Sequence, residues 1–503
     1  MNKLTNLLHW IDKNILTILV GGLIFVAPLY PKLPLSNVNY TYVSIRFDDL
    51  YIALMFFVFF IQLLRKKVSL SKKFLIPVLL FWGSVFISYF YAAYVQKTIE
   101  FKQVGLLNAL RRVEYMGVFF IAASCVTAKN FWRFIKLIVF VLVVVSVYGV
   151  GQKFLGFPAV QTMNPEYAKG YLLFLTPEAR ISSTFAGHYD LASYLVFLMP
   201  FVLGIYFFTL NISYFVAVIL AIAALVLTAS RVSYIAYIIS IPPFLLLIRK
   251  PKQLIIIILI TLTFTFLSKN LTSRFQRTFQ VKQIFVNQRT GQVVVPQKIT
   301  TKELPIGSFY VQINNKLSPV SAGNKAQVNR QVLQQVREEA SRSGRILTAT
   351  EEAKLVATFT ASLTPVNTVI SDISFATRLQ VEWPRAINAF LKSPILGTGP
   401  SSITEATDND YLRWIGEFGI LGTLTFLLIL FIIAWQPFAQ VMKKKLKDKE
   451  NYVYLGFLFG IVALMLNAAY IDVFEASKVA YQFWLLSGLI VGYIILKNAK
   501  AKS

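Results

Sequence analysis

The sequence predicts an all-α polytopic membrane protein with about twelve transmembrane helices. Of its 503 residues, 56% are hydrophobic and only 15% are charged, and the mean hydropathy is +0.61. Soluble domains are about a quarter charged. A membrane span needs roughly 20 mainly apolar residues to cross about 30 Å of hydrocarbon. The predicted spans lie near residues 14–31, 49–64, 74–95, 106–126, 131–150, 187–208, 212–229, 232–248, 253–268, 411–435, 452–471 and 478–496.

Basic residues fall in short connections on alternate sides of these spans. They cluster at 65–73, 129–133, 249–252, 443–445 and in the 497–502 tail. Because short cytoplasmic loops are enriched in Lys and Arg, we expect both termini in the cytoplasm and the long segment 269–377 outside. The formal net charge of +27 is then explained largely by the bilayer, and no nucleic-acid partner is expected.

Cysteine and histidine are almost absent. Cys125 is the single cysteine and lies in an apolar run, and the two histidines are His9 and His188. This composition argues against a disulfide framework and a His-rich metal centre. We expect no metal and no other cofactor.

The chain is expected to divide into four parts. Residues 1–268 would hold nine spans, and residues 411–503 the last three. Between them, 269–377 would form an extracytoplasmic loop or cap, and 378–410 a segment that re-enters the membrane.

The extracytoplasmic part is too long to be bare loop in a compact protein. Its stretch VKQIFVNQRTGQVVV alternates apolar and polar residues around a turn, which predicts a hairpin. Residues 327–363 have helical spacing. Their apolar set is Val332, Val336, Ile346, Leu355 and Val356. A small α+β cap over the outer face is therefore predicted.

Three arginines are candidates for binding an anion. Arg231 lies in TASRVSY, at the outer turn between two spans, where an ionised side chain usually faces a cavity or a partner, or else snorkels. Arg378 and Arg385 are seven residues apart, so one helix would present both on one stripe. An amphipathic interfacial helix would explain them, and so would a phosphate clamp, since guanidinium groups bind phosphate oxygens in bidentate fashion.

The next residues combine a glycine turn with acidic side chains. Gly397 and Gly399 could bring backbone amides close to an anionic ligand, although ordinary loops have the same composition. Asp408, Asn409 and Asp410 precede a span. Helix capping is the main expectation for Asp410, whereas Asp408 is a candidate general base.

A further polar cluster, RISSTFAGHYD, leads into the sixth span. Arg180 would add another cation at the outer side. His188 is either a proton carrier or an interfacial hydrogen-bonding residue.

Three segments, in this order, resemble the O-antigen ligase and O-antigen polymerase family. They are RISSTFAGHYDLASYLVFLMP, LTASRVSYIAYIIS, and RLQVEWPRAINAFLKSPILGTGPSSI followed by DNDYLRWIGEFGILG. Together they cover roughly residues 180–435, with the long external segment between the second and the third. Where the family's ligases typically have His, this chain has Asp408.

The resemblance implies a metal-independent glycosyltransferase of cell-surface polysaccharide assembly in the bacterial inner membrane. Its donor would be a glycan on undecaprenyl diphosphate, and its acceptor a glycan, a lipid such as the lipid A core of lipopolysaccharide, or a protein. By motif, Arg231 and Arg378 would bind the diphosphate, with Arg180 and Arg385 in support. Asp408 would take the base role or the role would be absent; His188, Asn409, Gly397 and Gly399 would be secondary.

Two other functions fit parts of the pattern. A transporter or flippase of lipid-linked glycans would also need arginines near a diphosphate, but should line a pathway with charges in both leaflets, and only Arg111 and Arg112 lie away from the outer cluster. A non-catalytic membrane partner of an envelope complex would tolerate replacement of Arg231 or Arg378.

Overall fold

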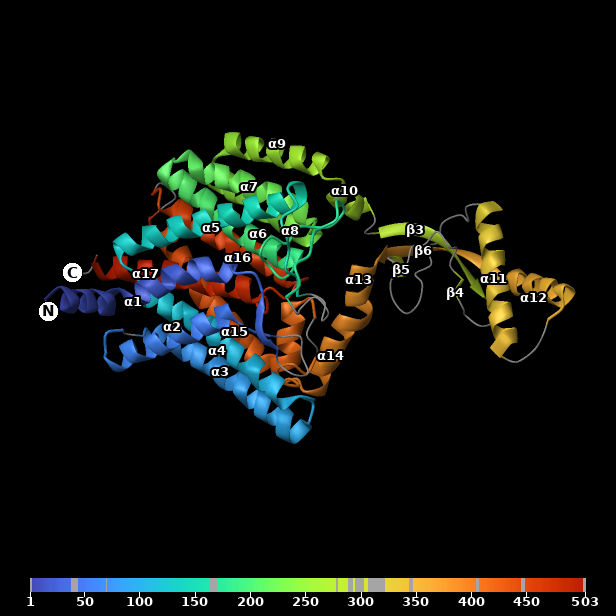
Figure 1. The fold of residues 1–503 in the computed structure, drawn as a ribbon, viewed down its shortest axis with the longest axis horizontal. Helices are drawn as coiled ribbons and strands as arrows, with labels where there is room; N and C mark the ends of the chain where they lie inside the picture. Colours follow the sequence, from blue (N-terminus) through green and yellow to red (C-terminus); the bar gives the residue numbers. More distant parts are fainter. Residues whose placement is uncertain are drawn as a thin grey trace. The chain divides into compact units, whose positions relative to one another are not determined.

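A computed structural model describes residues 2–37, 44–68, 70–162, 170–276, 279–287, 293–294, 303–305, 322–342, 347–403, 407–444 and 448–500. These residues form two compact units (Figure 1). The first comprises residues 1–272 and 385–503, and the second comprises residues 273–384.

The first unit is a helical bundle (Figure 1). Its helices and short strands are α1 (Asn2–Leu29), β1 (Pro34–Asn37), β2 (Ser44–Arg46), α2 (Phe47–Leu64), α3 (Lys72–Phe90) with a π-helical end η1 (Tyr91–Gln96), α4 (Lys102–Ser124), α5 (Ala128–Phe154), α6 (His188–Thr209), α7 (Ile212–Thr228), α8 (Arg231–Leu247), α9 (Pro251–Leu267), α15 (Asp410–Lys444), α16 (Asn451–Ala468) and α17 (Ser477–Lys500). Two helices, α10 (Lys269–Gln276) and α14 (Trp383–Lys392), run across the boundary between the units.

Each of the twelve predicted spans falls on a helix, which agrees with an all-α polytopic membrane protein. Within the described residues, eight helices are long and apolar enough to cross a membrane. A ninth would be α9 with α10, which meet at a bend of 85°, while α7 and α8 are shorter apolar helices. Helix α4 carries Arg111, Arg112 and Glu114 and falls outside this set. The number twelve therefore stays a prediction.

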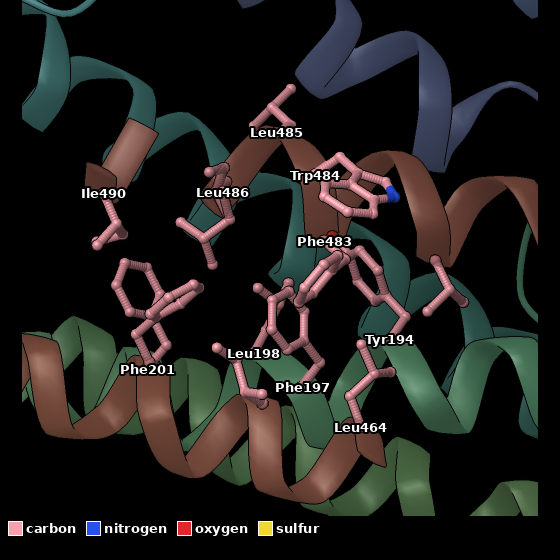
Figure 2. Packing of buried hydrophobic residues seen from close by; sticks show 14 of the residues in the cluster. Tyr194, Phe197, Leu198, Phe201, Leu464, Phe483, Trp484, Leu485, Leu486 and Ile490 are labelled. Atoms are coloured by element: carbon pink, nitrogen blue, oxygen red, sulfur yellow. The ribbon is translucent and has the colours of Figure 1, made fainter. Parts of the chain in front are cut away.

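Helix α6 lies at the centre of the bundle because it is apolar on every side. A helix of this kind has no face suited to water and is buried by its neighbours. In the most apolar stretch of α6, 89% of the residues are buried, whereas the corresponding share for α2 is 28%. Figure 2 shows Tyr194, Phe197 and Phe201 of α6 among Phe483 and Trp484 of α17.

Two glycines let α16 approach α6 closely. A Cβ at Gly456 would meet the Pro200 carbonyl oxygen at 2.3 Å, and one at Gly460 would meet the Phe197 carbonyl oxygen at 2.3 Å. Small residues are the usual means by which helix backbones come together in membranes. The close contact between α6 and α16 thus positions the ends of these helices, which are described below.

The second unit is α+β. Its four-stranded antiparallel sheet has the order β4-β3-β6-β5, from β3 (Phe279–Asn287), β4 (Val293–Val294), β5 (Glu303–Pro305) and β6 (Leu363–Asp372). Its helices are α11 (Ala322–Arg342), α12 (Ala349–Ala361), α13 (Ile373–Thr377) and the π-helical η3 (Arg378–Glu382). The position of this unit as an outer cap stays a prediction.

The predicted hairpin is confirmed, since β3 pairs with β4 through Phe285↔Val294 and Val286↔Val293. Strand β6 was not predicted, yet it pairs with β3 from Phe279↔Ser371 to Asn287↔Leu363.

The predicted helical stretch 327–363 is two helices rather than one. Val332 is buried in the small core with Phe285, and Val336 and Val356 pack against it. Leu355 is 45% exposed and does not belong to that core. Ile346 lies outside the described residues.

Candidate functional site

The first residues of α6, α8, α15 and α17 meet at one end of the bundle. In the first turn of α8, Ser233 donates a hydrogen bond to Oδ1 of Asn467 near the end of α16, at 2.6 Å. Nδ2 of Asn409, just before α15, donates to the Ala469 carbonyl at 2.9 Å. Nζ of Lys478, in α17, donates to the Thr184 carbonyl before α6 at 2.6 Å. His188, Arg231 and Asp410, which are the first residues of α6, α8 and α15, therefore lie at this end of the bundle.

Asp408 lies on a loop that a distant carboxylate holds in place. Oδ2 of Asp472 accepts hydrogen bonds from the backbone N–H groups of Thr407 at 2.9 Å and Asp408 at 3.0 Å, and Oδ1 accepts from Asn409 at 3.0 Å. Asp408 has φ of +50°, which L residues rarely adopt and which the surroundings must stabilise. The side chain of Asp408 is half-buried, while Thr407 and Asn409 are buried. Asp472 thus presents Asp408 on a fixed backbone.

Asp410 in turn accepts hydrogen bonds from the loop that contains Asp472. Its buried Oδ2 accepts from the backbone N–H groups of Val473 at 2.7 Å and Phe474 at 3.2 Å. The capping role expected of Asp410 belongs instead to Asn409, whose Oδ1 accepts from Leu412 N at 3.0 Å. The loops before α15 and α17 are therefore tied by exchanged carboxylates.

Buried ion pairs surround this junction. Arg413 pairs with Asp472 at 3.0 Å, and Arg112 pairs with Glu475 at 2.5 Å. Glu417 lies 3.9 Å from Arg112 and 4.0 Å from Arg413. Each charge needs such a partner, because an isolated charge in this environment would be very costly. In the described ranges, no three His, Cys, Asp or Glu side chains are grouped as metal ligands.

The glycine turn packs into a break in α15. Gly419 has φ of +63° and ψ of −166°, so the helix is interrupted there. The freed carbonyls of Gly416 and Glu417 accept from Thr398 N and Gly399 N, each at 2.9 Å. Gly397 N donates to Ser393 O at 2.8 Å. These amides, predicted to approach an anion, are occupied within the protein, and the glycines allow the two segments to touch.

Hydrogen bonds to a side chain also hold the segment before α6. Gln152 of α5 accepts from the N–H groups of Ser182 at 3.2 Å and Ser183 at 2.7 Å, and donates to the Ser183 carbonyl at 2.9 Å. The guanidinium of Arg180 lies 5.7 Å from the ring of Tyr189. That ring stands 4.0 Å from the imidazole of the buried His188. Arg180 and His188 are thus linked through one aromatic side chain.

The remaining two candidate arginines belong to different units. Arg378 belongs to the second unit, where it is 2% exposed and donates to the Ser374 carbonyl at 2.6 Å. Arg385 belongs to the first unit and is exposed on α14. Helical backbone runs through both residues, since the π-helical η3 continues directly into α14 at Trp383. That the two guanidinium groups share one stripe stays a prediction.

Sequence reasoning missed Asp472, Gln152 and Lys478. Nζ of Lys478 also donates to the carbonyls of Pro28 at 3.0 Å and Tyr30 at 2.6 Å. A lysine, or the charged Glu417, within an apolar helix is a signal that a buried partner exists. Asp472 offers no such signal, because its partners, Arg413 and three backbone N–H groups, lie 59 to 65 residues away in the sequence.

The fold and this polar end define a polytopic membrane protein whose helices frame a charged junction. A family model described as O-antigen ligase matches residues 216–427, from α7 into α15. The chain therefore carries the domain of the O-antigen ligase family, as the resemblance predicted. No curated protein matches the chain. The matched range contains Arg231, Arg378 and Asp408, whereas Arg180 and His188 precede it.

The family implies a glycosyltransferase-like role in cell-surface polysaccharide assembly. Together with the apolar helices, it indicates a multi-pass protein of the bacterial inner membrane that interacts with lipid-linked glycan.

Proposed function

We propose that this protein transfers an oligosaccharide from a lipid-diphosphate carrier to an acceptor hydroxyl at the outer face of the cytoplasmic membrane. The observation that carries the proposal is the fixed, half-buried Asp408 at the bundle end where α8 begins with Arg231, inside the range that matches the O-antigen ligase family. Both termini would lie in the cytoplasm and residues 269–377 outside.

In the proposed reaction, Asp408 accepts the proton of the acceptor hydroxyl. The freed oxygen attacks the anomeric carbon, and the bond from that carbon to the diphosphate oxygen breaks. The diphosphate leaves with the bonding electrons, and Arg231 and Arg378, supported by Arg180 and Arg385, stabilise the developing negative charge. A single displacement of this kind inverts the anomeric centre.

The surroundings of Asp408 support the base role. A catalytic group works best on a backbone that does not move, because misplacement by about 1 Å can cost about 100-fold in rate. The three hydrogen bonds to Asp472 provide such a backbone. Arg413 and Arg112 are engaged with Asp472 and Glu475, so we assign them to the frame of the site and not to the diphosphate.

The test uses purified protein, a lipid-diphosphate oligosaccharide and no nucleotide sugar. Release of the carrier diphosphate and the size of the glycan are followed for wild type, Asp408→Asn, Arg231→Gln and Arg378→Ala. Arg133→Gln is the matched control, since this exposed arginine lies near the first residues of α5, at the opposite end from Gln152.

We expect the first three variants to lose release by about 100-fold or more and the control to keep it. Lengthening chains would define a polymerase, and one transfer to an added acceptor would define a ligase. Undiminished release by Asp408→Asn would exclude the base role. Flipping of the donor without any release would refute the transferase.

A further inference from the structure

A cavity of roughly 400 Å³ lies between α2 and α4, and its lining combines both signs of charge. Two carboxylates, of Asp49 in α2 and Glu114 in α4, and the guanidinium of Arg111 in α4 belong to this lining. Most of the remaining lining is apolar, for example Ala53 of α2 and Leu107 of α4. We call this space the α2–α4 cavity, and Asp49, Arg111 and Glu114 its charged triad.

The members of the charged triad do not contact one another. Within the described residues, Arg111 forms no hydrogen bond or ion pair, although Glu114 lies three residues further along the same helix, where ion pairs commonly form. One oxygen of each carboxylate is used, since Oδ2 of Asp49 accepts from the Arg46 backbone N–H at 2.9 Å and Oε1 of Glu114 accepts from the Tyr481 hydroxyl at 2.5 Å. Among the same residues, Oδ1 of Asp49 and Oε2 of Glu114 accept no hydrogen bond.

The charged triad is complementary to a zwitterion. Opposite charges attract strongly in a space of low polarity. Asp49, Arg111 and Glu114 line one such space without contacting each other, so a ligand between them can contact all three. A positive group would pair with the two carboxylates and a negative group with the guanidinium. A purely anionic ligand does not fit, because the two carboxylates would repel it.

The triad lies at the depth of lipid head groups. Helix α2 is long and apolar enough to cross a membrane, so its first turn, which holds Asp49, lies near the surface of the hydrocarbon. Phe56 of α2 contacts α4 deeper in the bundle, where a Cβ at Gly117 would meet its ring at 2.1 Å. Asp49 lies seven residues before Phe56 and Arg111 six before Gly117, so each is about two turns, or roughly 10 Å, from that contact. The charged groups and the apolar wall beyond them therefore follow the order of a lipid's head and chains.

Apolar side chains connect the cavity with the outside of the bundle. Leu107 and Leu110 belong to the lining and are 47% and 46% exposed. Beside the cavity, Leu54 and Phe57 of α2 are exposed as well. In a membrane such surfaces contact lipid chains, so a lipid can enter the cavity sideways from the bilayer.

We propose that the α2–α4 cavity binds a zwitterionic bilayer phospholipid with a primary amine, of which phosphatidylethanolamine is the simplest. Its ammonium group donates hydrogen bonds to the open oxygens of Asp49 and Glu114, its phosphate accepts from Arg111, and its chains lie along the apolar wall of α2. A primary ammonium has three N–H donors, whereas the trimethylammonium group of phosphatidylcholine has none. The site uses neither Arg231 nor Asp408, so this inference does not depend on the proposed transfer reaction.

The test measures lipid binding to the delipidated, full-length protein by native mass spectrometry. The protein is titrated separately with phosphatidylethanolamine, phosphatidylcholine and phosphatidylglycerol that carry the same acyl chains. The variants are Glu114→Gln, Arg111→Gln, and Ala53→Phe, which fills the cavity and keeps the charged triad. Glu178→Gln is the matched control, since this exposed acid lies between α5 and α6. Thermal unfolding verifies that each variant is folded.

We expect the wild type to bind phosphatidylethanolamine about tenfold or more tightly than the other two lipids, because hydrogen bonds between charged groups are the strong ones. Glu114→Gln should reduce this preference for ethanolamine over choline. Arg111→Gln should weaken both of these lipids about equally, because both carry the phosphate. Ala53→Phe should do the same by occupying the space, and Glu178→Gln should change neither affinity.

Several results would overturn the proposal. Equal affinity of the wild type for phosphatidylethanolamine and phosphatidylcholine would exclude the pairing of the ammonium group with the carboxylates. Tighter binding of phosphatidylglycerol would mean that the site selects an anion, and the absence of any bound lipid would exclude a lipid site. These comparisons use the wild type alone, so they decide the matter even if a variant fails to fold. Binding that Ala53→Phe leaves unchanged would place the lipid elsewhere on the bundle.

Discussion

Replacement of Asp472 should disable the loop that carries Asp408. Asp472 accepts three backbone hydrogen bonds and pairs with Arg413 at 3.0 Å. The variant Asp472→Ala leaves all four donors without their acceptor. Asp472→Asn keeps one oxygen and the side-chain shape but loses the charge and places an amide nitrogen against N–H groups.

The size of the effect follows from burial. The side chains of Asp472 and Arg413 are 11% and 7% exposed, so the charge left on Arg413 would be poorly hydrated. Removing one member of a buried pair costs about 3–5 kcal/mol, and a buried N–H without a partner costs about 1–3 kcal/mol. We therefore expect Asp472→Ala to lower the free energy of unfolding by about 3–5 kcal/mol, and Asp472→Asn by about half as much.

The assay combines thermal unfolding in detergent with release of the carrier diphosphate. Asp12→Asn is the matched control, because Asp12 is also a carboxylate in ion pairs, with Arg65 and Lys67, but its side chain is 27% exposed. That variant should change stability little, as for other exposed pairs. If Asp472→Ala unfolds at the wild-type temperature and releases diphosphate at the wild-type rate, the loop does not depend on this carboxylate and the reasoning fails.

Three other predictions concern the frame of the site. Lys478→Met should lower the free energy of unfolding by about 3 kcal/mol or more, measured by thermal unfolding, because three buried carbonyls lose their donor; an unchanged melting temperature would contradict this. Gly460→Val should prevent the α6–α16 contact, since its Cβ would stand 2.3 Å from the Phe197 carbonyl oxygen, and poor yield of folded protein by size-exclusion chromatography would show it, with Gly83→Val, which meets nothing within 4 Å, as the control. The free energy of unfolding should rise between pH 8 and 10.5, because folded Lys32 loses its proton near pH 8 and the unfolded chain keeps it; in Lys32→Met the rise should be smaller, by on the order of 3 kcal/mol.

Local patterns predicted the helices but not the contacts between their ends. Runs of apolar residues determine where a helix can form, so all twelve predicted ranges fall on helices. The pairing of β3 with β4 was also predicted from a local pattern, because the signal for a hairpin lies within 15 residues of sequence.

The site was predicted only as separate residues. Arg231 and Asp408 were recognised because charge beside an apolar span is costly, but nothing near Asp408 points to Asp472. The turn at Gly397 and Gly399 was expected to offer backbone amides to an anion. The amides of Thr398 and Gly399 instead donate to carbonyls freed by the break at Gly419, and that break is set by the packing of two segments. Non-local backbone partners leave no pattern that one sequence can reveal.

The hydrogen bonds that Asp472 and Asp410 accept from each other's loops also have a consequence for biogenesis. The loop at 407–409 leaves the ribosome some 60 residues before the carboxylate that holds it, with α15 and α16 in between. While those helices enter the bilayer, Asp408 has no support for its left-handed backbone. This junction can therefore form only once residues 472–474 have been translated. A chain that stalls earlier would have its first helices in the bilayer without the contacts that hold residues 407–409.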